Sequence, residues 1–336
     1  MSFLGGIYTA LAAVIAFAVT ALSGIKLVPF LHKLKFGQNI REEGPTWHRS
    51  KQGTPTMGGI MFAAGSLIAL IISYSLYCAS VGGETMLSVV RTAAGMLMAS
   101  AMGLIGFMDD FISIKKKRNL GLNELQKLRL QFAVVICYLI TIRLAGGSDS
   151  MVIPFVGTVR WGIFYYIISA VFIVGMVNAV NFTDGIDGLN SSVTFVVCLC
   201  FMVISFILKN AGMAVLAAAT AGGCLGFLIW NFNPAKVFMG DTGSLFLGGM
   251  VCALAYGINA PILLIPMGII YIAEIVSVVM QVTYYKLTHG KRIFKMTPIH
   301  HHFELCGWNE IKICFVFSAV SLAAGLVCIL LAAFGM

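Results

Sequence analysis

Charged residues are scarce in this sequence. Asp, Glu, Lys and Arg make up 10% of its 336 residues, whereas they supply about 25% of an ordinary soluble domain. Hydrophobic residues make up 59%, above the usual share of about 45–50%. The shortage of charge therefore excludes a soluble globular protein and indicates a polytopic membrane protein.

Cysteine pairs, a signal-peptide pattern and internal repeats are also missing. The nine cysteines form no CxxC pair and stand mostly inside apolar runs, which argues against a disulfide framework or a zinc knuckle. No basic segment precedes the first apolar run and no small-residue cleavage site follows it, so we interpret it as a retained membrane helix. Matched halves, which inverted-repeat transporters often show, are not evident.

Ten apolar runs have about the length of ~20 residues that a helix needs to cross a bilayer. We therefore predict an all-α polytopic membrane protein with about ten transmembrane helices in a single domain, residues 1–336. The eighth run is short and rich in glycine. The runs are Phe3–Leu22, Met57–Tyr77, Ser88–Phe107, Leu128–Leu144, Trp161–Val180, Ser191–Leu208, Gly212–Trp230, Ser244–Ile258, Pro261–Tyr285 and Lys312–Phe334.

The basic residues are divided unequally between alternate loops. One set of loops holds 18 of the 22 Lys and Arg residues, including Lys35, Arg41, Arg49 and Lys115–Arg118, and the other set holds 4. The positive-inside rule places the first set in the cytoplasm, and ten helices then put both termini outside. The net charge of +9 thus indicates orientation and an anionic lipid or substrate, not nucleic acid.

Polar residues gather on the predicted cytoplasmic side, in five stretches near helix ends. The predicted outer loops have only two acids, Glu84 and Asp149, and a small hairpin is expected around Val156-Gly157. This convergence predicts a cytoplasmic active site. The five stretches are GTPTMGG (Gly53–Gly59), GFMDD (Gly106–Asp110), NAVNFTDGIDGLN (Asn178–Asn190), NFNPAKVFMGDTGSLFLGG (Asn231–Gly249) and TPIHHHFE (Thr297–Glu304).

Asp241 stands where a new apolar helix begins. Free backbone N–H groups and the helix dipole favour anions there, and a cation held by Asp241 would hold phosphate. Asp109-Asp110 closes the third run, at a helix end where the dipole disfavours anions. The pair is explained if both carboxylates bind Mg²⁺, or if one binds Mg²⁺ and the other acts as a base. The alternative for Asp241 is a simple helix-capping loop, and the alternative for Asp109-Asp110 is a solvated acidic pair.

Asp184 and Asp187 are three residues apart, so one helical turn would put them on one face. Gly185 and Gly188 permit close approach of a ligand to the backbone, while a capping turn is the alternative. The run His300–His302 favours phosphate contact over a three-histidine zinc site, because consecutive side chains do not all face one ion. Glu274 lies inside the ninth run, where an acid needs a buried partner.

Taken together, these motifs resemble the phospho-N-acetylmuramoyl-pentapeptide-transferase (translocase I) family, in order and over essentially the whole chain. The resemblance implies a Mg²⁺-dependent phosphoglycosyl transferase in the bacterial inner membrane. Its partners would be UDP-N-acetylmuramoyl-pentapeptide, undecaprenyl phosphate and membrane lipid, its products UMP and lipid I, and its assembly a homodimer. A sister transferase that uses UDP-N-acetylglucosamine, and a transporter, are the competing interpretations.

The resemblance also implies residue roles. Asp241 and Asp110 would bind the metal, Asp109 would act beside them as base or covalent nucleophile, and His300 would assist catalysis. One departure is Ser113, where relatives often carry Lys, so Lys115 is expected to substitute. The implied substrate-binding residues, with Phe238 stacked on uracil, are Lys51, Thr56, Lys127, Asn181, Asp184, Asp187, Asn231, Phe238, His301 and His302.

Overall fold

The computed structural model describes residues 3–34, 51–82, 84–116 and 121–336. The basic residues Lys35, Arg41, Arg49, Lys117 and Arg118, which entered the orientation argument, lie outside these ranges. The elements are α1 (Phe3–Lys33), α2 (Gly59–Val81), α3 (Met86–Lys116), α4 (Glu124–Leu144), β1 (Ser150–Ile153), β2 (Gly157–Arg160), α5 (Ile163–Phe182), α6 (Leu189–Ile207), α7 (Ala211–Asn231), α8 (Gly240–Gly257), the 3₁₀ turn η2 (Pro261–Leu263), α9 (Leu264–Met267), α10 (Ile269–Leu287), α11 (Ile299–Glu304) and α12 (Glu310–Gly335).

The prediction of an all-α polytopic membrane protein is confirmed. Nine helices in the described ranges are long and apolar enough to cross a membrane. The predicted eighth run is also a helix, α8, but Asp241, Thr242 and Ser244 lie in its first turns and lower its hydropathy. Every α8 residue from Thr242 to Gly257 is buried, so α8 is a central helix, packed mainly against α3 and α5.

Close helix packing around α8 depends on small residues. In a membrane, helices associate through close van der Waals packing more than through the hydrophobic effect. A Cβ on Gly249 would lie 2.8 Å from the Cα of Ala99 on α3, and one on Gly248 would lie 2.7 Å from the Cα of Val177 on α5. These two glycines therefore let α8 lie directly against the backbones of its neighbours.

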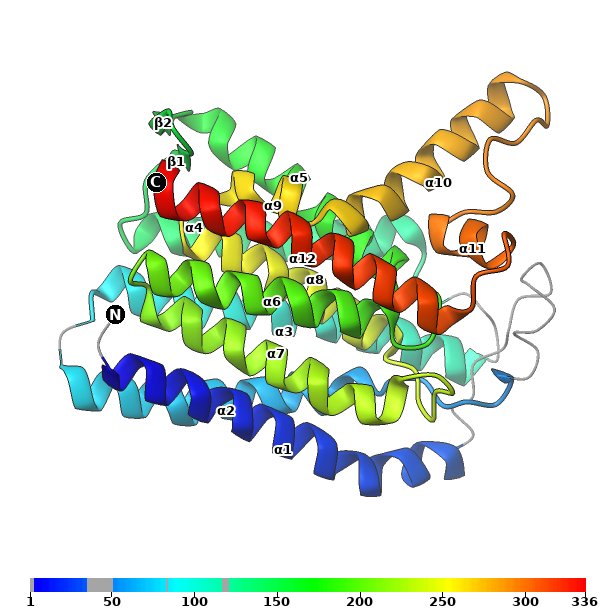
Figure 1. Cartoon of the computed structure of the whole chain (residues 1–336), viewed down its shortest axis with the longest axis horizontal. Helices are drawn as coiled ribbons and strands as arrows, with labels where there is room; N and C mark the ends of the chain where they lie inside the picture. The colour runs from blue at the N-terminus through cyan, green and yellow to red at the C-terminus, as the bar shows by residue number, and fades with distance from the viewer. Residues whose placement is uncertain (1–2, 35–50, 83, 117–120) are drawn as a thin grey trace.

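The helix boundaries differ from the predicted runs in two places that matter for the site. α3 continues to Lys116, so Asp109 and Asp110 lie inside the helix and not at its C-terminal end. The ninth run is divided at Gly268 into a short helix, α9, and α10. In Figure 1, α10 points away from the rest of the bundle, and it exposes Val279 and Met280.

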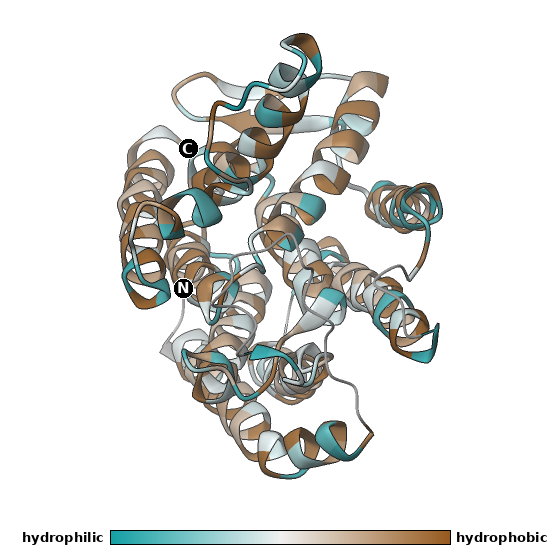
Figure 2. Ribbon diagram, turned by 90° about the vertical axis from the view of Figure 1, so that its right-hand side faces the viewer, coloured by the Kyte–Doolittle hydropathy of each residue, from teal (hydrophilic) through white to brown (hydrophobic). Residues whose placement is uncertain are grey.

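The two ends of the bundle differ in character. The start of α1, the end of α12 and the antiparallel β1–β2 hairpin lie at one end, and α11 and the loop before α8 lie at the other (Figure 1). The hairpin pairs Ser150 with Arg160 and Ile153 with Gly157, as predicted around Val156-Gly157. Seen from the α11 end, hydrophilic residues occupy helix ends and loops, while the flanks are hydrophobic (Figure 2).

Candidate active site

The Gly53–Gly59 and Asn231–Gly249 stretches are joined by backbone hydrogen bonds. The N–H of Phe238 donates to the carbonyl of Pro55 over 2.8 Å, and the N–H of Gly58 donates to the carbonyl of Phe238 over 2.9 Å. A Cβ on Gly59 would lie 2.2 Å from the Cα of Gly243, so glycine is required at position 59. This junction places Thr56, which is buried, beside the first turn of α8.

Asp110 caps the N-terminus of α8. Its carboxylate accepts hydrogen bonds from the N–H of Asp241 (3.2 Å), the N–H of Thr242 (3.0 Å) and the Thr242 hydroxyl (2.6 Å). A Cβ on Gly106, one turn earlier on α3, would lie 2.0 Å from the carbonyl oxygen of Asp241. The GFMDD motif thus packs α3 against the start of α8, and Asp110 satisfies N–H groups that a helix end leaves free.

Asp241 is the centre of a second set of contacts. One carboxylate oxygen pairs with the ammonium group of Lys127 on α4, and the other accepts a hydrogen bond from the amide of Asn181 on α5 over 2.8 Å. Asn181 also donates to the Ser244 hydroxyl over 2.7 Å. Three helices therefore meet at one carboxylate, and the cation beside the acidic pair is Lys127, whereas the expected substitute, Lys115, is exposed.

Asp109 and Asp184 complete this carboxylate cluster, which comprises Asp109, Asp110, Asp184 and Asp241. Asp109 accepts a hydrogen bond from the N–H of Leu122 over 2.8 Å and lies near enough to Asp241 and Lys127 to feel both charges. Asp184 stands in the segment between α5 and α6. Burial raises the pKa of its carboxyl well above the ordinary value, and the charges of Asp241, Asp110 and Asp187 raise it further.

The donor chemistry of the cluster suits a hard divalent cation. Among the described residues, these four acids have one close cation, Lys127. A divalent cation would relieve the mutual repulsion that helps to raise the pKa of Asp184. Within the described ranges, no three His, Cys, Asp or Glu side chains are grouped tightly enough to hold an ion by themselves. Mg²⁺ typically uses one or two carboxylates and takes its other ligands from substrate phosphate and water, so the cluster fits that mode and not an all-protein cage.

Asp187 belongs to a different cluster, formed with Lys51, Asn233 and Glu310. The Lys51 ammonium lies 2.7 Å from Asp187 and 2.6 Å from Glu310, and Asn233 donates to the Asp187 carboxylate over 3.2 Å. Asp184 and Asp187 do not share a helical face, because α5 ends at Phe182 and α6 begins at Leu189. That part of the sequence argument was wrong: the connecting segment points the two carboxylates to separate clusters.

Glu310 is a member of this cluster that sequence reasoning missed. It is the first residue of α12, where an acid favours the helix dipole, and its carboxylate also accepts the N–H of Asp187 over 3.0 Å. The available signal was an acid directly after the capping residue Asn309. Nearby, the buried Asn231 accepts the N–H of Gly188 over 3.2 Å and donates to the carbonyl of Val237 over 3.0 Å.

The three histidines have different partners. His300 is fully buried, and its Nδ1 lies 3.0 Å from the carboxylate of Glu274 on α10, which supplies the partner that Glu274 needed. His300 packs on Gly185, where a Cβ would lie 2.1 Å from its Nε2. His301 contacts Glu304 over 2.6 Å, and His302 accepts the N–H of Lys295 over 3.2 Å. His300 thus joins α10 to the Asp184–Asp187 segment.

The fold and site together define a class: a polytopic membrane protein that gathers carboxylates, Lys127 and buried histidine at one end of its helix bundle. The sequence matches the model of glycosyl transferase family 4 over residues 92–259. It also matches the phospho-N-acetylmuramoyl-pentapeptide-transferase signature 1 over residues 51–62, the stretch that contains Lys51 and Thr56.

Curated relatives agree with these matches over nearly the whole chain. The phospho-N-acetylmuramoyl-pentapeptide-transferase of Clostridioides difficile strain 630 is 46% identical over 316 residues, which cover 92% of each chain. That of Caldicellulosiruptor bescii is 45% identical over 312 residues, 92% of each chain. That of Listeria monocytogenes serotype 4b is 43% identical over 314 residues, 93% of this chain and 94% of the relative. The chain belongs to the phospho-N-acetylmuramoyl-pentapeptide-transferase family.

Proposed function

We propose that this protein transfers phospho-N-acetylmuramoyl-pentapeptide from UDP-N-acetylmuramoyl-pentapeptide to undecaprenyl phosphate, releasing UMP and forming lipid I for peptidoglycan. The observation that carries the proposal is the meeting of α3, α4, α5 and α8 at Asp241, through Asp110, Lys127 and Asn181. Family membership supplies the substrates. The position at one end of the bundle suits a reaction between a membrane-bound prenyl chain and a soluble nucleotide.

Phosphoryl transfer depends on positioning and charge neutralisation by the protein more than on covalent catalysis. The attacking group is a phosphate monoester with a second pKa of about 6, so it is largely ionised at neutral pH. Lys127 would neutralise charge on the transferred phosphate. Asp109 would align the attacking phosphate or remove its residual proton, and attack by Asp109 itself is the competing covalent mechanism.

Asp241, with Asp110 or Asp109, would hold Mg²⁺, which when bound neutralises diphosphate oxygens. Asp110 would hold the α8 start in place through its bonds to Thr242 whether or not it also contacts the ion. Phe238 is half-buried beside this site, consistent with a stack on the uracil. His300 would position the Asp184–Asp187 segment, because it packs on Gly185, and His301 and His302 would contact the diphosphate.

The test is release of UMP by the purified protein in detergent with both substrates and Mg²⁺. We expect release with UDP-N-acetylmuramoyl-pentapeptide and none with UDP-N-acetylglucosamine, and we expect chelation of Mg²⁺ to stop the reaction. Asp241→Asn is expected to abolish turnover in a folded protein, because an amide contributes no charge to the ion. Release with UDP-N-acetylglucosamine alone would reassign the protein to the sister transferase.

We further propose that the carboxylate-cluster end of the bundle faces the cytoplasm of a bacterial inner membrane, with both termini outside. The supporting observation is that the start of α1 and the end of α12 lie at the same end of the bundle, opposite the site. The homodimer and the single domain over residues 1–336 remain predictions, and the mass of the protein in a native-like bilayer disc would test the first.

A further inference from the structure

A groove lies between α4 and α5 at the end of the bundle opposite the carboxylate cluster. Its volume is about 520 Å³, and its walls are apolar apart from Arg143 and Tyr166. Ile140 on α4 and Ile167 on α5 are 53% and 55% exposed, so the groove opens on the flank that faces lipid. The lining residues are Phe132, Ile136, Leu139, Ile140, Arg143, Leu144, Tyr166, Ile167, Ala170 and Val171.

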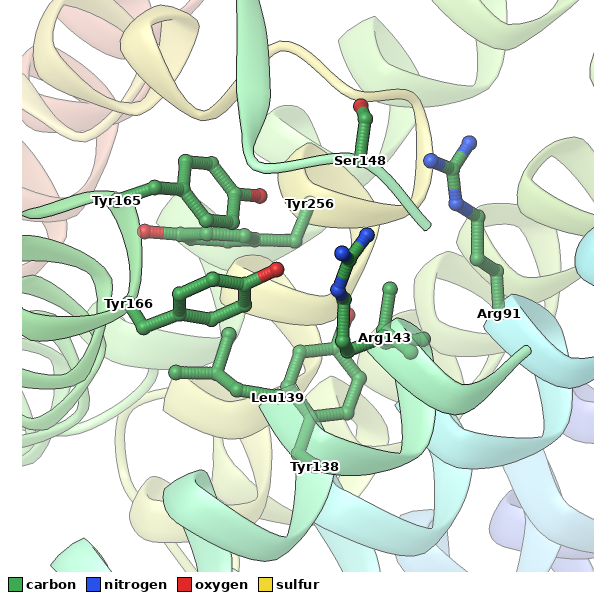
Figure 3. Close-up of a pocket in the computed structure, with 9 residues that line it drawn as sticks. Arg91, Tyr138, Leu139, Arg143, Ser148, Tyr165, Tyr166 and Tyr256 are labelled. Atoms are coloured by element: carbon green, nitrogen blue, oxygen red, sulfur yellow. The ribbon is translucent and has the colours of Figure 1, made fainter. Parts of the chain in front are cut away.

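A polar niche adjoins the groove at its outer end. Arg143, Tyr166 and Leu139 line both spaces, so the two are continuous. Figure 3 shows the guanidinium groups of Arg91 and Arg143 on one side of the niche and the rings of Tyr165, Tyr166 and Tyr256 on the other. The niche has space for about one water-sized group, roughly 10 Å³. This space suits a single oxygen atom of a ligand and is too small for an acyl chain.

The positive charge of the niche is not balanced by the described residues. Arg91 comes from α3 and Arg143 from α4, and no Asp or Glu is among the described residues that line the niche or the groove. Asp149, the acid whose charge acts on Arg143, is already paired with Arg160 over 2.9 Å. Placing a charged arginine within the membrane costs free energy unless an anion or a carbonyl group pairs with it.

Hydrogen-bond donors in the niche also lack partners. The Nε of Arg91 and the hydroxyl of Tyr166 are buried and make no hydrogen bond to any described residue. Arg143 donates to the carbonyl of Gly147 over 3.1 Å, and its other guanidinium donors have no hydrogen-bond partner within the described part of the chain. Guanidinium forks match phosphate oxygens in a bidentate geometry, and a tyrosine hydroxyl is suited to the membrane interface.

We propose that an anionic glycerophospholipid binds here, with one oxygen of its phosphodiester in the niche formed by Arg143, Arg91 and Tyr166 and one acyl chain in the α4–α5 groove. The ligand must carry a negative head and an apolar tail, because the niche is cationic and the groove beside it is apolar. The site is separate from the proposed prenyl-phosphate site. Arg143 is 16 residues from Lys127 along α4, or about 24 Å at 1.5 Å per residue.

The experiment measures lipid retained by the purified protein in native mass spectrometry. Phosphatidylglycerol and phosphatidylcholine with identical acyl chains are compared. We expect preferential retention of phosphatidylglycerol, and we expect Arg143→Gln to lower its affinity about tenfold, as the loss of a charge-assisted hydrogen bond does. Ala170→Trp, which fills the groove and leaves both arginines, is expected to lower it as well.

Lys209→Gln is the matched control, since Lys209 is basic, lies at the same end between α6 and α7, and is not among the residues lining the groove. It is expected to retain phosphatidylglycerol normally, and UMP release by Arg143→Gln should equal that of the unchanged protein. Equal retention of the two lipids, an unaffected Arg143→Gln or Ala170→Trp, or an equal loss in Lys209→Gln would overturn the proposal.

Discussion

At the residue scale, Asp109 is the side chain whose role separates two mechanisms. It lies near Asp241 and Lys127, and it accepts a hydrogen bond from the N–H of Leu122. We expect Asp109→Asn to lose most activity at neutral pH and to recover part of it at higher pH, because the attacking phosphate ionises without help above its pKa of about 6. UMP release measured against pH, beside the profile of the unchanged protein, checks this. No recovery at any pH would favour the covalent mechanism.

Phe238 is a second single residue with a separable effect. Its backbone is fixed by hydrogen bonds to Pro55 and Gly58, so truncating its side chain should leave the loop in place. We expect Phe238→Ala to raise KM for the uridine nucleotide more than it lowers kcat, since stacking binds ground and transition states alike. The expected loss in the free energy of nucleotide binding is roughly 1–3 kcal/mol, the contribution of stacking on one base.

The control for this stack is Phe232→Ala. Phe232 is another aromatic residue of the same loop and is 37% exposed, and no role in nucleotide binding is proposed for it. KM and kcat are measured for both variants by varying the concentration of the uridine nucleotide. An unchanged KM in Phe238→Ala, or an equal change in Phe232→Ala, would remove Phe238 from the site.

At the element scale, α8 is held at its N-terminus by a side chain from α3. The Thr242 hydroxyl donates to Asp110 over 2.6 Å, so Thr242→Val removes a donor and leaves the carboxylate. We expect the free energy of unfolding to fall by about 1.5–3 kcal/mol, the usual value for a hydrogen bond to a charged group, and activity to fall with it. Thermal unfolding in detergent measures the change.

The matched control is Thr288→Val. Its hydroxyl donates to the carbonyl of Tyr284 over 2.6 Å at the exposed end of α10, where water replaces the lost bond. We expect little change in stability or turnover. A Thr242→Val protein as stable as the Thr288→Val protein would show that the hydroxyl bond does not help to hold α8, and would leave only the backbone N–H groups of Asp241 and Thr242 as partners of Asp110 there.

At the scale of the whole molecule, the orientation in the membrane can be tested with two cysteines at opposite ends. Cys306 is exposed beside α11, and Thr158 is exposed on the hairpin strand β2. In sealed cells we expect a membrane-impermeant maleimide to label Thr158→Cys and to leave Cys306 unmodified. Cell lysis should make Cys306 reactive. Labelling of Cys306 in intact cells would show that the protein has the opposite orientation in the membrane. Cys137, the other exposed cysteine, is replaced by Ser in both variants.

The sequence by itself determined the membrane class, the helices and the set of polar stretches. These depend on local properties: an apolar run of ~20 residues forms a helix in lipid because its backbone must satisfy its own hydrogen bonds. For the same reason, the hairpin around Val156-Gly157 and the start of a helix near Asp241 could be predicted. The length of α3 could not, because α3 continues beyond Phe107 to Lys116 and its Asp110 bonds to the start of α8, a contact that no local pattern reveals.

Only the tertiary structure decided which polar residues meet. Asp184 and Asp187 are neighbours in sequence and serve different clusters, whereas Lys127 and Asp241 are 114 residues apart and form an ion pair. Glu310 and the Glu274–His300 pair likewise join segments that no local pattern connects. The physical reason is that these contacts depend on the directions of side chains on packed helices, and close approaches such as Gly106 against Asp241 fix those directions.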